Sequence, residues 1–220
     1  TLMSVGRTPG IEDLFSDGPH LGSYSYEIGN PNLKLEKTIG IETSLQYSGD
    51  QFSFMMNGFV NNSPNFHQYT QMGKCPEPFV PGKPHPCAGA DFIEWGSGSS
   101  GWLYKYQMMG LKTQITGGEV QLKYYGKRLD ISADLSLVRG KDTSNKNHLP
   151  YMPADKLKIL LSSKSDKNLT GTLRMTRGFR QSRISEFETI TPGYFLVDIF
   201  GSYSFNALNS SHRLFFQINN

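Results

Sequence analysis

Three side chains that can bind a metal ion lie in one turn-rich segment near the start of the chain. Asp17, His20 and Glu27 stand within residues 14–37, LFSDGPHLGSYSYEIGNPNLKLEK. Imidazole nitrogens and carboxylate oxygens are common ligands of zinc and related ions. The same segment contains two runs of turn residues, DGP and GNPN, which suit tight reversals. We therefore expect a structured loop that holds a metal ion or a polar ligand.

Each of these residues also has an ordinary structural interpretation. The Asp17 carboxylate suits the turn that follows it, where it can accept backbone hydrogen bonds. Glu27 can stabilise the loop as a hydrogen-bonding partner, and the His20 ring can pack on Tyr24 or Tyr26. From residue types alone, His20 is the first candidate metal ligand and Glu27 the second.

A further group of possible ligands lies in residues 62–101, which we interpret as one long loop. His67 and His85 occur there together with Glu77 and Asp91, and the two histidines can sample a metal ion weakly. The loop also contains five prolines between residues 76 and 86. Prolines bias the backbone toward extended geometry, so a stiff surface loop without a metal is the alternative.

The two cysteines of the chain, Cys75 and Cys87, both fall in this loop. Their proximity predicts a disulfide, which indicates an oxidising compartment such as the periplasm or the cell surface. A free or metal-binding pair is the alternative, although the spacing is too wide for a zinc-ribbon knuckle.

The remaining charged residues give no indication of catalysis or of nucleic-acid binding. The net charge of +3 is small and the basic residues are scattered, so we expect no nucleic-acid partner. Carboxylates on the expected polar strand faces lack a nucleophile and a base within sequence reach, so we expect no enzyme and no cofactor. These carboxylates are Glu42, Glu119, Asp130, Asp134 and Asp198.

A run of arginines enters the loop at residues 178–193. Arg180 and Arg183 are its last members, and they can form the rim of a site for an anionic ligand or contact lipopolysaccharide. A solvated loop edge is the alternative interpretation.

Alternation of apolar and polar residues dominates the rest of the chain, which predicts β-strands. The expected strands are residues 1–7, 38–47, 52–60, 102–125, 129–137, 157–161, 169–175, 197–205 and 214–218. Within the longest one, the apolar parity changes beyond Gly117-Gly118, which predicts a β-bulge at the glycines.

The connections alternate between short and long. Short turns are expected at 48–50, 126–127, 165–168 and 206–211, and long loops at 8–37, 62–101, 139–155 and 178–193. Short turns on one rim and long loops on the other are typical of outer-membrane barrels, with the long loops extracellular. Apolar residues make up only 37% of the chain, which suits a barrel with one apolar and one polar face, and no stretch approaches the roughly 18 apolar residues of a membrane helix.

These patterns predict an all-β fold, an antiparallel transmembrane β-barrel portion of about nine strands. An odd, open sheet would leave unpaired edges in lipid, so residues 1–220 are expected to be part of a larger barrel. A soluble β-sandwich is the alternative fold.

Two motifs near the start resemble the TonB-dependent outer-membrane receptors. Residues 4–15, SVGRTPGIEDLF, resemble the R-A-P-x-x-x-E-L-F segment of that family, and residues 27–36, EIGNPNLKLE, resemble its GNPxLKPE segment. Thr8 and Leu35 depart from the usual Ala and Pro. Gly117-Gly118-Glu119 stands where the family has a GxE strand signature. The resemblance spans nearly the whole chain.

The resemblance implies a 22-stranded barrel, of which this chain is roughly the last third, without plug and closing strands. It implies transport across the outer membrane of a Gram-negative bacterium, driven by a TonB-ExbB-ExbD complex through the missing plug. The expected contacts are lipid, lipopolysaccharide and a metal ion or metal chelate.

The segments DGPH at 17–20, YEIG at 26–29 and FETITPGY at 187–194 resemble the zinc-uptake branch of this family. That likeness implies His20 as a ligand for zinc, with the rest of the site in the plug and other loops. A ferric-siderophore or haem receptor is the alternative, because Tyr69 and the loop arginines suit a larger ligand. A non-transporting adhesion barrel and a soluble carbohydrate-binding β-domain are further alternatives.

Overall fold

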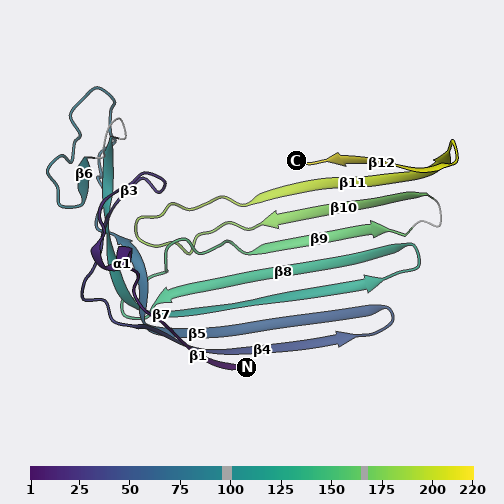
Figure 1. The fold of residues 1–220 in the computed structure, drawn as a ribbon, viewed down its shortest axis with the longest axis horizontal. Coiled ribbons are helices and arrows are strands. Elements are labelled where there is room, and N and C mark those ends of the chain that lie inside the picture. The colour runs from purple at the N-terminus through teal and green to yellow at the C-terminus, as the bar shows by residue number, and fades with distance from the viewer. Residues whose placement is uncertain (96–100, 165–167) are drawn as a thin grey trace.

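One curved antiparallel sheet makes up most of the computed structural model, which describes residues 1–95, 101–164 and 168–220 (Figure 1). Its strands follow one another in the order of the sequence, each pairing with the next in antiparallel fashion. They are β1 (Leu2–Arg7), β4 (Glu36–Ser48), β5 (Phe52–Gln71), β7 (Trp102–Tyr125), β8 (Leu129–Asp142), β9 (Lys156–Ser163), β10 (Leu169–Gly178), β11 (Tyr194–Ala207) and β12 (Ser210–Ile218). The predicted all-β antiparallel fold is confirmed, including the nine strands of this path.

Short turns and long connections lie at opposite ends of the sheet, as predicted (Figure 1). At the right-hand end, β11 turns into β12 through Leu208 and Asn209, whose φ angles are 52° and 59°. Two consecutive positive φ values characterise the tight hairpin turn that matches the twist of paired strands. The turn predicted at 165–168 falls largely on residues 165–167, outside the described residues.

The two faces of the sheet differ in polarity because the strand register aligns residues of equal parity. Leu45, Met56, Val120, Leu135 and Leu157 are directly paired across five strands. The adjacent row, on the opposite face, consists of Ser44, Asn57, Glu119, Ser136 and Lys156. One face is therefore an exposed apolar surface, and the other is polar.

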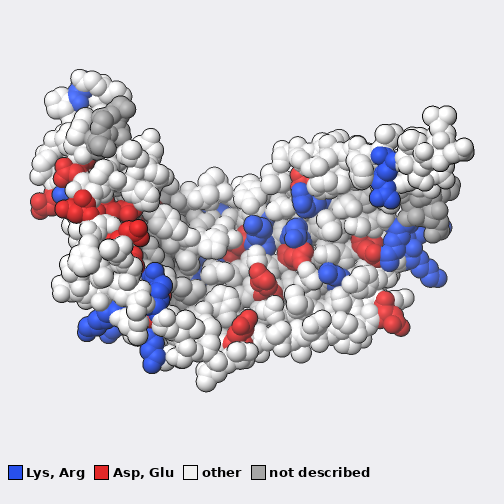
Figure 2. All heavy atoms as spheres, viewed as in Figure 1, with Lys and Arg blue, Asp and Glu red and all other residues white. Residues whose placement is uncertain are grey.

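Charged side chains gather on the hollowed polar face (Figure 2). Neighbouring strands neutralise them in pairs: Lys164 lies 2.7 Å from Asp130, Arg174 2.9 Å from Asp198, and Lys158 3.7 Å from Asp134. Three of the five predicted inward-facing carboxylates, Asp130, Asp134 and Asp198, thus belong to ion pairs of the sheet.

The bulge predicted at Gly117-Gly118 is wrong. β7 keeps its register with both neighbours through the glycines, and the irregularity lies in β5 between Ser63 and Phe66. This interval contains Pro64, which has no N–H to donate to the ladder. A Cβ at Gly117 would lie 2.6 Å from the Phe59 ring, so this glycine makes room for the aromatic side chain of the paired strand.

β5 is longer than predicted, because it continues through residues 62–71 to Gln71. The upper half of β7 pairs with these residues, His67 with Gly110 and Tyr69 with Met108. Polar side chains occupy both faces here, so the alternation is lost although the strand continues. The connection between β5 and β7 therefore begins at residue 72, and it contains β6 (Ile93–Trp95), which also pairs with β7.

The connection between β1 and β4 is structured, as its turn residues predicted. It contains α1 (Ile11–Phe15), β2 (Asp17–His20) and β3 (Ser25–Ile28), which pairs with β2 and lies parallel to the upper end of β7. The short helix was not predicted, because five residues show no helical period. No helix in the described ranges has the length and apolarity needed to cross a membrane.

The GNPN run holds α1 against β3. Gly29 donates to the Ser16 carbonyl at 2.7 Å, and Asn30 donates to the Asp13 carbonyl at 2.8 Å. A Cβ at Gly29 would lie 2.6 Å from the backbone of Leu14. Only glycine permits this close approach of two backbones.

Substitution of Gly29 tests this contact. Gly29→Ala is expected to weaken the attachment of α1 by about 1–3 kcal/mol, because backbone atoms cannot move aside as side chains can. Faster amide hydrogen exchange in residues 10–30 would report the loss. Gly18→Ala is the control, because a Cβ there meets nothing within 4 Å; equal exchange in both variants would contradict the argument.

Candidate functional site

His20 and Glu27 lie side by side on the β2–β3 hairpin. The Nδ1 atom of His20 is 2.8 Å from Oε1 of Glu27. Because a carboxylate only accepts hydrogen bonds, Nδ1 carries a proton, and the lone pair of the neutral tautomer then lies on Nε2. The His20 side chain is 61% exposed, whereas that of Glu27 is 19% exposed. The structure therefore brings the first two candidate ligands together and presents one nitrogen to solvent.

Glu27 is held by its own loop. Its Oε1 atom also accepts hydrogen bonds from Ser25 Oγ at 3.0 Å and from Ser23 Oγ at 3.3 Å. With His20, these bonds converge on a single carboxylate oxygen, which orients the imidazole. Glu27 is thus a positioning partner of His20 in this structure, as its structural interpretation predicted.

A shallow cavity of about 520 Å³ opens beside this pair. Its lining includes Glu12, Asp13, Asp17 and Tyr69 as well as His20 and Glu27. The acidic side chains of this region form a red cluster at the left of Figure 2. Asp17 accepts a hydrogen bond from the Tyr26 hydroxyl at 3.0 Å, so its carboxylate stabilises the hairpin rather than the turn after it.

The site around His20 is incomplete within this chain. Among the described residues, no group of three ligand atoms of metal-site dimensions includes His20. A zinc site normally uses three or four protein ligands. A metal ion at His20 would thus need donors beyond this pair.

His67 and His85 do not share a site. The His67 side chain is fully buried, and its Nε2 donates to the Lys34 carbonyl at 2.8 Å, while its backbone N–H donates to Glu36. His85 lies instead beside the Cys75–Cys87 disulfide, which is present as predicted with a Cα–Cα distance of 5.9 Å. His67 is therefore a packed residue of β5 with no ring nitrogen open to solvent, and its role as a weak ligand stays a prediction.

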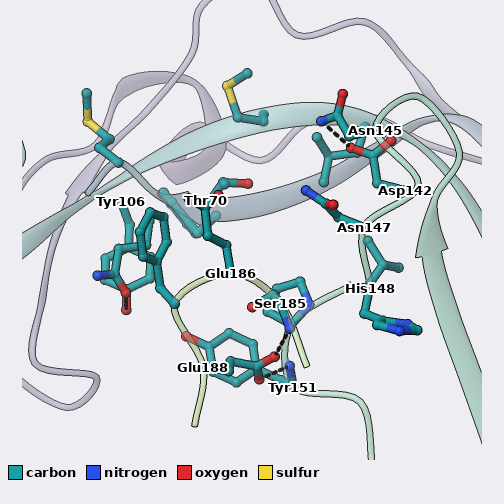
Figure 3. A pocket seen from close by; sticks show the side chains of 18 of the residues that line it. Thr70, Tyr106, Asp142, Asn145, Asn147, His148, Tyr151, Ser185, Glu186 and Glu188 are labelled. Carbon is teal, nitrogen blue, oxygen red and sulfur yellow. Dashed lines mark hydrogen bonds between the residues drawn. The ribbon is translucent and has the colours of Figure 1, made fainter. Parts of the chain in front are cut away.

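A large cavity on the upper part of the sheet was not predicted from the sequence. It measures about 740 Å³ and lies between the upper parts of β5 and β7 and the connections 143–155 and 179–193 (Figure 3). Its polar lining includes Tyr106, Asp142, Asn145, His148, Tyr151 and Glu188. Met109 and Leu111 add apolar surface, which explains the changed parity of β7 without a bulge. The run NKNHLPY at 145–151 was the available signal, but its residues show no spacing typical of a site.

Glu188 joins the two connections that form this cavity. Its carboxylate accepts the backbone N–H of Tyr151 and that of Ser185, each at 2.7 Å (Figure 3). Gln181 makes a second link, because its side-chain amide donates to the carbonyls of Met152 and Pro153. Hydrogen bonds between side chains of one connection and the backbone of the other therefore join the walls of the cavity.

Asp155 forms an ionic clamp between β8 and the same two connections. It accepts two hydrogen bonds from Arg139, at 2.5 and 2.7 Å, and one from Arg183 at 3.1 Å. The Arg139 hydrogen bonds, assisted by the charges of Arg139 and Arg183, lower the pKa of the Asp155 carboxyl below its ordinary value. Arg183 is thus engaged in the clamp with its side chain 34% exposed, and Arg180 is exposed; the role of the two arginines at a ligand rim stays a prediction.

Comparisons with known proteins agree with this architecture. A sequence model of the family described as TonB dependent receptor-like, beta-barrel, matches residues 4–220. The solved structure of the copper transporter OprC is similar, with 19% identity and a TM-score of 0.69, over 92% of this chain and 28% of that one.

Two further solved structures resemble the chain. The ferric enterobactin receptor PfeA of Pseudomonas aeruginosa shares 17% identity, with a TM-score of 0.58 over 92% of this chain and 29% of PfeA. The siderophore receptor PirA of Acinetobacter baumannii shares 14% identity, with a TM-score of 0.58 over 93% of this chain and 32% of PirA. These likenesses show the fold, and the chain spans about a third or less of each protein.

The Asp155 clamp has a defined pH dependence. Because its folded-state pKa is lowered, the clamp contributes its full stability above the ordinary carboxyl pKa of 3.8 and loses it as the pH falls through the lowered value. Asp155→Asn is expected to remove about 2 kcal/mol at neutral pH. Hydrogen exchange of residues 143–155 and 179–193 from neutral to acidic pH measures both effects, with exposed Asp50→Asn as the control. If amide hydrogen exchange in Asp155→Asn were as slow as in the unsubstituted protein, the clamp would be refuted.

Proposed function

The chain belongs to the TonB-dependent receptors, as part of their β-barrel, and we propose that it serves an outer-membrane transporter whose cargo is a scarce metal, zinc above others. The His20–Glu27 pair carries this proposal. Metal-binding histidines characteristically donate their second ring N–H to a carboxylate, which fixes the tautomer and raises the basicity of the free nitrogen. The 2.8 Å contact between His20 Nδ1 and Glu27 Oε1 matches this arrangement, with Nε2 as the nitrogen that would bind the metal.

The surroundings of His20 support a cationic cargo. Glu12, Asp13 and Asp17 line the same cavity. Like charges along a concave surface raise the local concentration of a counter-ion. A zinc ion arriving here would meet carboxylates first and an oriented imidazole nitrogen second. Further ligands would come from the plug and from loops outside this chain.

We further propose how the chain sits in the membrane. The apolar face of the sheet contacts lipid and the polar face lines the lumen. The long connections then lie outside the cell, where they meet lipopolysaccharide and the incoming cargo. Energy would reach the transporter from a TonB-ExbB-ExbD complex through the plug, which lies outside residues 1–220.

A ferric siderophore or haem is the second candidate cargo, and one observation favours it. The cavity of about 740 Å³ between the connections 143–155 and 179–193 has the volume of sites that bind small organic molecules. A bare metal ion needs far less space. Its lining combines apolar side chains with hydroxyl, amide and carboxylate groups, which suits an organic chelate.

Zinc binding by the intact receptor in detergent tests the first proposal. His20→Ala is expected to weaken zinc binding by at least about tenfold through loss of a ligand, and Glu27→Gln by about tenfold through loss of its orientation. Isothermal titration and metal analysis give the affinities. His212→Ala, on β12 at the short-turn end, is the control. If the zinc affinity of His20→Ala equalled that of the unsubstituted receptor, a metal chelate would be the better candidate cargo.

The membrane orientation is tested by a matched pair on β4. Leu45 is 57% exposed on the apolar face, and Ser44 lies on the polar face. Leu45→Arg is expected to destabilise the receptor in lipid vesicles by about 2–4 kcal/mol, because it exposes a charge to hydrocarbon. Ser44→Arg is expected to have a much smaller effect. Urea unfolding measures both, and a larger loss for Ser44→Arg would reverse the assignment of the faces.

A further inference from the structure

Three potential metal ligands converge in the connection between β5 and β6. The sulfur atoms of Cys75 and Cys87 and a ring nitrogen of His85 all lie within 4.8 Å of one another. Cys75 and His85 are 7% and 8% exposed. This group lies outside both the His20 site and the large cavity.

We propose that reduction of the Cys75–Cys87 disulfide creates a zinc site made of two thiolates and the His85 imidazole. Thiolate sulfur and imidazole nitrogen are the donors that structural and catalytic zinc sites use. At the usual zinc–sulfur distance of about 2.3 Å, two sulfurs in a tetrahedral site lie about 3.7 Å apart. The two sulfurs therefore have to move only a short distance apart, and the imidazole nitrogen already lies within 4.8 Å of them.

The surroundings of His85 place its ring for this role. In the oxidised form its Nδ1 accepts a hydrogen bond from the Cys87 N–H at 3.1 Å, which ties the ring to the second cysteine. In the neutral ring this nitrogen holds the lone pair, so zinc would replace the Cys87 N–H at Nδ1. Phe79 and Trp102 pack on the imidazole, with ring centroids 5.5 and 5.1 Å away. An apolar shell of this kind limits access of water to bound metal.

The connection has means of keeping its shape when the disulfide opens. The Cys75 N–H donates to the Tyr104 hydroxyl of β7 at 3.3 Å. Two backbone bonds close successive turns, from Ala88 to the His85 carbonyl at 3.0 Å and from Ala90 to the Cys87 carbonyl at 3.1 Å. None of these contacts involves sulfur. The reduced cysteines thus remain close to His85.

The chemistry of the switch balances without a cofactor. Two molecules of a low-molecular-weight thiol are oxidised to their disulfide, and Cys75 and Cys87 each gain a hydrogen as their S–S bond breaks. Zinc then displaces both thiol protons to the medium. The two thiolates neutralise the dication, and the fourth position stays open to water. In the oxidised state the sulfurs are bonded to each other and the site cannot form.

The test compares oxidised and reduced forms of the intact receptor carrying His20→Ala, so that the proposed cargo site does not contribute. The protein is reduced with a phosphine, desalted without oxygen and titrated with zinc. We expect the reduced form to bind a further zinc ion that the oxidised form does not. With cobalt as the probe, a thiolate-to-metal charge-transfer band should appear only after reduction.

Variants distinguish this site from unspecific zinc binding by the thiols that reduction produces. Adding His85→Ala is expected to weaken zinc binding by the reduced form at least about tenfold, and Cys75→Ser with Cys87→Ser is expected to abolish it. His212→Ala, on β12 at the short-turn end, is the control and should have no effect. Equal zinc binding in both redox forms, or binding that ignores His85, would overturn the proposal. So would reduced protein that binds no zinc, because the contacts around His85 would then have failed to hold the ligands together.

Discussion

Strand pairing along β7 is the constraint on which the rest of this structure depends. Its 24 residues pair with β5 and β8 in the sheet and with the short strands β3 and β6 beyond it. The lower half keeps a strict register that separates the apolar from the polar face. The upper half supports the His20 hairpin and the disulfide connection and lines the large cavity. A shift of this strand by one residue would turn every side chain to the opposite face.

The two family-like motifs near the start prove to be one structural unit. Arg7, from the first motif, lies 2.9 Å from Glu36 at the end of the second, and 3.6 Å from Asp13. Gly29 and Asn30 close the unit by donating backbone hydrogen bonds to the segment around α1. The unit is anchored to β7, whose Gln107 side chain donates to the Gly29 carbonyl at 3.0 Å. These motif residues therefore build the support on which the His20 hairpin stands.

Two of the long connections above the sheet are joined to each other by side-chain hydrogen bonds. Asp155 and Glu188 together join residues 143–155 to residues 179–193, so the two walls of the large cavity are bound to each other. The connection with the disulfide is separate from these and packs on Trp102 and Tyr104 of β7. The cavity beside His20, the large cavity and the disulfide connection are thus three separate places in the described structure.

Local sequence determined the nine strands of the main sheet, their antiparallel order and the two faces, because alternation and turn chemistry act between residues close in the chain. It also indicated the disulfide and the structured segment around His20. It did not reveal the short strands β2, β3 and β6. Only the tertiary structure decided which polar residues meet. It buried His67 against Lys34, engaged Arg183 in the Asp155 clamp, and formed the large cavity from residues far apart in the chain. Those contacts depend on strand register and on loop docking over long separations, which no local pattern encodes.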